Sequence, residues 1–382
     1  MPVADSDPLS RLPLAEFRPY SRLRLLQSTV PRASVPAVDG HTHIGRWLTG
    51  DQWAVPDVAA FVALMDSCNV GAVVNLDGRW GDELEANLDR YDRPHPHRFA
   101  TFCHVDWEML RGPGAEEKLS ASLERSVAAG ARGLKVWKDL GLGVTDGHGT
   151  VVLPDDPRLG GLWETAGRLG VPIAIHTADP VAFFDPVDAR NERLEELLAR
   201  PDWSFCDPRF PRFERLMAAL EAIVAAYPAT TFIGVHAGCC AEDLAWVGRM
   251  LGQYPNFNID IAARIAELGR QPRAARSLIM NHPDRVLFGT DEIPPNRSTY
   301  EIYFRFLETA DECFPYSADN PPVSGRWPIS ALDLPAGVVA QVYAGNAQRL
   351  MPALAPPTGG EVSPSPVLTG VRPSAHAGAE RQ

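Results

Sequence analysis

The sequence predicts a single (β/α)₈ TIM barrel. Eight short apolar or β-branched runs recur along the chain, and longer segments with helical spacing separate them. Eight parallel strands that alternate with helices are what a closed barrel of this type requires. An open doubly wound sheet gives the same alternation, but its phosphate-binding signature is missing, because "GLGVTDG" has Asp146 where the third glycine belongs.

The predicted strands are short and rich in β-branched or aromatic residues. They are VPAVDGHTH, GAVVNLDG, FATFCHVD, ARGLKVWK, VPIAIHT, TTFIGVHAG, NFNIDIA and RVLFGTD, at residues 35–43, 71–78, 99–106, 131–138, 171–177, 230–238, 256–262 and 285–291. Among the predicted helices, one covers 57–68 with Pro56 in its first turn, and one ends at Gly130.

The barrel is expected to occupy residues 36–352. Residues 1–35 read as an N-terminal extension, and residues 353–382, rich in Pro, Gly and Ser, are expected to be disordered because they cannot bury enough apolar surface. A long insertion follows the fifth predicted strand and contains Phe184 and Trp203. Loops at this position often shape an active site, so these aromatic side chains either close over a substrate or pack the insertion onto the barrel.

The composition is that of a globular protein with an acidic surface. Of 382 residues, 45% are hydrophobic and 22% charged, and 36 basic against 48 acidic residues give a net charge of -12. This balance disfavours a nucleic-acid or anionic-membrane binder. The N-terminal residues lack the pattern of a signal peptide, and no apolar run has the length needed to cross a bilayer. We therefore expect a soluble, cytoplasmic protein.

Chemically active side chains stand where the predicted strands end. In a (β/α)₈ barrel the catalytic residues come from the C-terminal ends of different strands. One such residue has an ordinary structural explanation, but a set of them at the same end favours a metal-dependent site. In strand order the set is His41, His43, Lys135, His176, His236 and Asp291.

These motifs resemble the amidohydrolase superfamily. The segments VDGHTHIG, GLKVWKDLGLGV, IAIHTADP, FIGVHAG, VLFGTDEIP and YAGNAQRLM carry the resemblance, which runs from about residue 36 to 352. They are most similar to the amidohydrolase-related branch that contains aminocarboxymuconate-semialdehyde decarboxylase and related decarboxylases and lactonases.

The resemblance implies one divalent metal ion, usually Zn²⁺. Its ligands would be His41, His43, His176 and Asp291, with Asp291 also taking a proton from the water and His236 acting on the water or the substrate. Such a metal activates water and polarises carbonyl groups. Lys135 would be an unmodified ammonium that faces the substrate. The alternative is a carboxylated Lys135 that bridges two metals.

The leading functional hypothesis is a metal-dependent hydrolase that directs activated water at a small carboxylated substrate. A non-oxidative decarboxylase on the same scaffold is the alternative, and a non-catalytic ligand-binding barrel is a more remote one. Cations near the expected barrel mouth favour an anionic substrate, although ordinary salt bridges also explain Arg46 and Arg264. These cations are Arg46, Lys135, Lys138 and Arg264. The resemblance further suggests a homo-oligomer.

Overall fold

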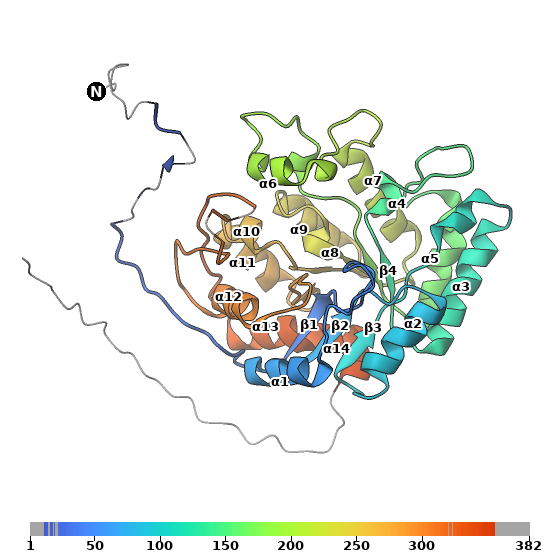
Figure 1. Cartoon of the computed structure of the whole chain (residues 1–382), viewed down its shortest axis with the longest axis horizontal. Helices are drawn as coiled ribbons and strands as arrows, with labels where there is room; N and C mark the ends of the chain where they lie inside the picture. The colour runs from blue at the N-terminus through green and yellow to red at the C-terminus, as the bar shows by residue number, and fades with distance from the viewer. Residues whose placement is uncertain are drawn as a thin grey trace, which may run out of the picture.

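Eight parallel strands form the interior of the part of the chain that the structure describes, and helices surround them (Figure 1). The structure is a computed structural model that describes residues 22–319, 321–322 and 324–355, with residues 11–13, 16, 17 and 19. The strands are β1 (Ala37–Thr42), β2 (Val70–Asn75), β3 (Phe99–Thr101), β4 (Leu134–Val136), β5 (Ile173–Ile175), β6 (Phe232–Gly234), β7 (Phe257–Asp260) and β8 (Val286–Leu287). All eight predicted strands are confirmed.

Backbone hydrogen bonds close the strands into a ring. Strands β1 to β3 pair in order, as do β4 to β8. Between β3 and β4, the Lys135 amide donates to the Cys103 carbonyl over 2.7 Å. Between β8 and β1, the Asp291 amide donates to the His41 carbonyl over 2.8 Å, and Thr42 pairs in parallel with Glu292. The predicted barrel is therefore confirmed, and its last closing contacts lie at the ends that carry the candidate site.

Helices cover the outside of the ring. The longer ones are α1 (Val58–Cys68), α2 (Gly81–Asn87), α3 (Ala115–Ala129), α5 (Gly160–Leu169), α7 (Phe213–Ala226), α9 (Leu244–Gln253), α11 (Pro272–Asn281) and α12 (Arg297–Glu308). The shorter ones are α4 (Asp139–Leu142), α6 (Leu194–Ala199), α8 (Val235–Gly238), α10 (Ile265–Leu268), α13 (Ala336–Ala340) and α14 (Asn346–Leu350). No helix in these described ranges has the length and apolarity to cross a membrane.

The helix ends follow the local chemistry of the sequence, with one correction. Helix α1 begins one residue later than expected, because the Asp57 side chain accepts a hydrogen bond from the Ala60 amide and so caps the helix. Pro56 therefore precedes the helix and does not lie in its first turn. Gly130 ends α3 at a φ of 134° as predicted, since glycine tolerates this backbone region.

The predicted terminal segments are described only in part. In the N-terminal extension, the Ser28 hydroxyl donates to Asp311 over 2.8 Å and ties residues before β1 to the segment after α12. At the other end, the chain forms a short 3₁₀ turn over Pro352–Leu354. The rest of the predicted disordered tail, residues 356–382, lies outside the described residues.

Buried ion pairs hold the insertion after β5 against the barrel. Arg193, whose side chain is 3% exposed, lies 2.7 Å from Glu196 and also pairs with Glu267 of α10, which follows β7. Buried charges are tolerated only where partners compensate their lost hydration. The insertion, at the top of Figure 1 around α6, is therefore joined to the barrel by the buried ion pair between Arg193 and Glu267.

We predict that Arg193→Ala lowers the free energy of unfolding by about 3–5 kcal/mol, because it leaves two buried carboxylates without their cation. The matched control is Arg249→Ala, which removes an exposed pair with Glu221 and is expected to cost less than about 1 kcal/mol. Urea denaturation followed by circular dichroism measures both. Equal losses in the two variants would contradict the anchoring role of Arg193.

Candidate metal centre

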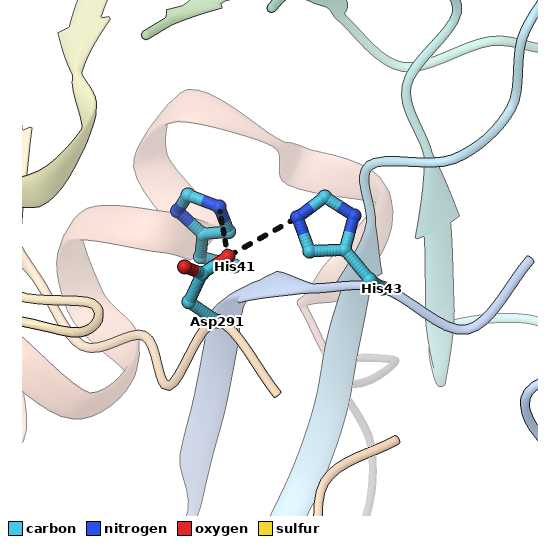
Figure 2. Close-up of side chains that lie close together, drawn as sticks. All are labelled: His41, His43 and Asp291. Atoms are coloured by element: carbon cyan, nitrogen blue, oxygen red, sulfur yellow. Dashed lines mark ion pairs between the residues drawn. The ribbon is translucent and has the colours of Figure 1, made fainter. Parts of the chain in front are cut away.

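His41 in β1, His43 just after this strand and Asp291 after β8 converge on one point (Figure 2). His41 Nε2 lies 3.0 Å and His43 Nε2 3.1 Å from the same oxygen, Oδ1 of Asp291. The two imidazole rings lie 5.5 Å apart between centroids and are almost fully buried. The i, i+2 spacing at the end of β1 thus places both rings on one face, as the sequence predicts.

Two further carboxylates orient these imidazoles from behind. Asp260, at the end of β7, lies 2.7 Å from His41 Nδ1, and Asp77, just after β2, lies 2.6 Å from His43 Nδ1. A carboxylate acceptor fixes the proton on Nδ1 and leaves the Nε2 lone pair for a metal. Asp77 and Asp260 were not among the site residues predicted from the sequence, although each stands near the end of a predicted strand.

The atoms that converge fit a divalent cation. Nε2 of His41 and of His43 is buried without a hydrogen-bond partner and faces a carboxylate oxygen. Lone pairs and an anionic oxygen repel each other unless a cation or added protons lie between them. Burial opposes charge on His43, but Asp77 and Asp291 outweigh it and raise its pKa to about 9. Imidazole nitrogen and carboxylate oxygen are ligands that Zn²⁺ accepts.

His236 and His176 extend this cluster. The His236 ring centroid lies 4.9 Å from that of His41, and His236 Nε2 lies 3.9 Å from Asp291 Oδ2. A second group with metal-ligand spacing, His41, His236 and Asp260, overlaps the first at His41. His176 is in neither group; its ring lies 4.5 Å from that of His236, and its Nε2 lies 3.2 Å from Asp179 Oδ1.

Both of these histidines are neutral, as metal ligands and proton acceptors must be. Burial lowers the pKa of His236 well below its ordinary value, and the neighbouring His176 adds to this effect. Burial likewise lowers the pKa of His176 to about 4, although the hydrogen bond to Asp179 opposes the shift. The imidazoles therefore offer lone pairs across the neutral pH range.

The backbone is strained where two of these side chains leave it. His236 has a φ of 59° and Asp291 a φ of 68°, in the left-handed region that non-glycine residues rarely adopt. Such residues cost on the order of 1–3 kcal/mol each and concentrate at functional sites. Gly289 permits the close approach of β8 to β1, because a Cβ there would lie 2.8 Å from the Cβ of His41.

A cavity of about 560 Å³ adjoins the cluster. Two of the residues that line it are Lys135, in β4, and Trp137, which follows β4. The centroid of the Trp137 ring lies 5.4 Å from that of the His43 ring and 5.8 Å from that of the His176 ring. The Lys135 Nζ is buried without a hydrogen-bond partner and lies 5.4 Å from the centre of the Trp137 ring. Burial lowers the pKa of Lys135, and Asp291 is the strongest of the charges that oppose this.

Of the four cations expected at the barrel mouth, two have tight partners elsewhere. Arg46 is bound by Glu83, with a closest distance of 2.7 Å, and Lys138 by Asp179 at 2.5 Å. Arg264 is buried and donates to the Ala263 carbonyl. These contacts leave Lys135, within the described ranges, as the expected cation whose charged group has no hydrogen-bond partner.

The two aromatic residues expected to contact substrate pack within the insertion itself. Phe184 lies 5.4 Å from Phe205 and 5.6 Å from Phe213, measured between ring centroids. Trp203 stacks on Phe183 at 6.1 Å. Neither lines the cavity beside Lys135. The cavity is lined instead by residues that were not predicted as site residues from the sequence, among them Trp47, Trp80, Trp107 and Arg79.

Comparison with protein families identifies the family to which this barrel and its histidine cluster belong. The model of the family described as Amidohydrolase matches residues 38–352, which is most of the chain. The chain belongs to the amidohydrolase family. It is therefore a metal-dependent enzyme, and His41, His43 and Asp291 are this family member's candidate metal site. A comparison with curated proteins finds no match.

Solved structures share the barrel of this amidohydrolase family member. A 2,6-dihydroxybenzoate decarboxylase from Rhizobium has 16% identity and a TM-score of 0.53, covering 83% of this chain and 99% of its own. A dihydroxybenzoic acid decarboxylase from a Polaromonas species, with bound manganese and the inhibitor 2-nitroresorcinol, has 16% identity and a TM-score of 0.54, with coverages of 83% and 97%. An uncharacterized TIM-barrel protein from Bordetella bronchiseptica has 13% identity, a TM-score of 0.51 and coverages of 83% and 99%. At these identities the likeness establishes the fold.

We predict that Asp77→Asn weakens metal binding about 10- to 100-fold, because the carboxylate that orients His43 is lost. Asp311→Asn is the matched control: it alters a buried aspartate that pairs with Ser28 and Arg305 outside the cluster. Equilibrium dialysis against Zn²⁺ or Mn²⁺ measures both affinities. Unchanged affinity in Asp77→Asn would show that Asp77 does not support the metal ligands.

Proposed function

We propose that this enzyme, with one divalent metal bound, releases carbon dioxide from a small planar carboxylic acid. The observation that carries the proposal is the unpartnered, buried Lys135 Nζ beside the Trp137 ring, in a cavity that adjoins the histidine cluster. Two barrels of similar fold are decarboxylases of dihydroxybenzoic acids, and one of them holds 2-nitroresorcinol, another planar ring. A buried cation beside indole rings suits such a ligand.

The chain's own residues would bind and orient the acid. The Lys135 ammonium would pair with the carboxylate, since a charge-assisted hydrogen bond is strong where water is excluded. The indole rings of Trp137 and Trp47, 5.4 Å apart between centroids, would contact the planar part of the substrate. The Trp47 Nε1 donates to Asp77 over 2.8 Å, so this ring is held by the same carboxylate that orients His43.

The metal would be held by His41, His43 and Asp291, with His176 and His236 next to them, and when bound it supplies Lewis-acid stabilisation of negative charge. The carbon that loses carbon dioxide must gain a proton. Water supplies this proton: His236 Nε2 would accept it, the negative charge of Asp291, with Oδ2 3.9 Å away, would stabilise the imidazolium, and Nε2 would then deliver the proton to the carbon. The carboxylate then leaves as carbon dioxide, and a C–H bond replaces the C–C bond.

Hydrolysis is the second candidate and rests on the same pair of residues. His236 Nδ1 lies 2.8 Å from the Ala262 carbonyl, so its proton is fixed there and Nε2 is free to accept one. Next to Asp291, this nitrogen could deprotonate water as readily as it could protonate carbon. The two reactions share the metal ligands and differ in whether water enters the product.

We infer one metal ion and an unmodified Lys135. The ammonium form has a favourable contact with the Trp137 ring, whereas carboxylation would place a new anion against that ring. Imidazole and carboxylate donors suit Zn²⁺, and they also accept Mn²⁺, the metal in the Polaromonas relative. Metal analysis of the purified protein identifies the ion and its stoichiometry.

A substrate screen in ¹⁸O-labelled water separates the two reactions. Hydroxybenzoic and muconate-like acids, lactones and amides would be offered to the metal-loaded protein, with carbon dioxide and product mass as readouts. Decarboxylation releases carbon dioxide without label in the organic product, whereas hydrolysis places ¹⁸O in it. Labelled product without carbon dioxide would replace our proposal with the hydrolase.

We predict that Asp291→Asn lowers kcat about 10²- to 10⁴-fold, because the neutral amide cannot stabilise the positive charge that His236 gains when it takes up a proton. Lys118→Met, which removes an exposed lysine of α3, is the control and should leave kcat unchanged. Near-normal turnover by Asp291→Asn, with metal content verified, would contradict the role given to this carboxylate in either reaction.

A further inference from the structure

A second cation faces the cavity that contains Lys135. Arg79 follows β2 and lines this cavity together with Trp47, Trp80 and Trp137. Its guanidinium carbon lies 4.9 Å from the centre of the Trp47 ring and 4.2 Å from that of Trp80. Among the described residues, the guanidinium has no hydrogen bond and no ion pair.

The neighbouring arginines, unlike Arg79, have carboxylate partners. Arg111 lines the same cavity but pairs with Glu108 at 2.7 Å, and Arg46 nearby pairs with Glu83. The carboxylates of Asp106 and Asp139 also line the cavity, yet neither comes within ion-pair distance of Arg79. Burial lowers the pKa of Arg79, and the longer-range attraction of Asp139 and Asp106 opposes this shift without occupying the donors of the guanidinium.

The local backbone holds Arg79 in this place. Arg79 has a φ of 55°, which side-chain-bearing residues rarely adopt, and its carbonyl accepts the His104 amide over 2.8 Å. Strained residues persist where the surroundings hold them and where the strain serves a function. Contacts with two indole rings further restrict the guanidinium, so its N–H edge is ready to bind before a ligand arrives.

We propose that Arg79 binds a second carboxylate of the substrate, so that the enzyme selects planar dicarboxylic acids over monocarboxylic ones. The guanidinium offers paired N–H donors that match the two oxygens of a carboxylate. Lys135, close to the metal ligands, binds the carboxylate that is lost as carbon dioxide. Arg79 binds the second carboxylate, which is attached farther along the planar substrate. This proposal rests on the proposed function and narrows its substrate class.

The test compares the binding of two acids that differ by one carboxylate. Benzoate and isophthalate (benzene-1,3-dicarboxylate) would be titrated into the metal-loaded full-length protein, with tryptophan fluorescence as the readout, since four tryptophans line the cavity. Isophthalate should bind the wild-type protein at least about 10-fold more tightly than benzoate, because a charge-assisted pair is added. In Arg79→Gln this gain should vanish while benzoate affinity stays unchanged.

Arg111→Gln is the matched control, because Arg111 lines the same cavity but is already paired, and it should keep the preference for isophthalate. A melting curve of each variant accompanies the titrations. If Arg79→Gln lowers the affinity for both acids equally and lowers the melting temperature, Arg79 has a structural role and the proposal is wrong.

The remaining outcomes separate this proposal from the proposed function. If benzoate binds and isophthalate binds no better, the Arg79 proposal fails while the carboxylate site beside Lys135 stands. If neither acid binds the wild-type protein, a planar carboxylic acid is not the substrate, and both proposals fail together.

Discussion

Contacts between buried imidazoles and carboxylates hold the ends of this barrel's strands together. His41 and His43 face Asp291 with their Nε2 atoms, while Asp260 and Asp77 hold them from the other side. None of these five groups could be buried alone, because an unpaired charge or polar atom in the interior is costly. They lie at or just after the ends of β1, β2, β7 and β8, so the interactions that prepare a metal site also tie the two halves of the β-sheet ring together.

The fold could be predicted from the sequence because its signals are local. Each strand is a short apolar run, and parallel strands buried on both faces need no further pattern. The helix ends are equally local: Gly130 ends α3, and Asp57 caps α1 by accepting one backbone amide. The misplaced Pro56 shows the limit of this reasoning, since two adjacent residues both suit a helix start and only the capping hydrogen bond decides between them.

The site was predictable only where the signal was a residue type at a strand end. His41, His43, His236 and Asp291 fit that description, and the structure brings them together. Arg79 does not, since its place in the cavity depends on a positive φ and on indole rings from separate loops. The positions of Asp77 and Asp260 near strand ends made them candidates. Their role could not be predicted, because nothing in the sequence distinguishes an acid that orients a histidine from one that caps a loop.

The distribution of charge explains how an acidic protein can prepare a pocket for an acid. Two of the cations expected at the barrel mouth are used in the architecture: Arg46 pairs with Glu83 and Lys138 with Asp179. A paired cation offers little to a ligand, because a new carboxylate would have to displace the old one. Lys135 and Arg79 are held instead against indole rings, which favour a cation but do not occupy its hydrogen-bond donors. The specificity of the cavity therefore depends on which cations lack a carboxylate partner, and the net charge of the chain carries no information about it.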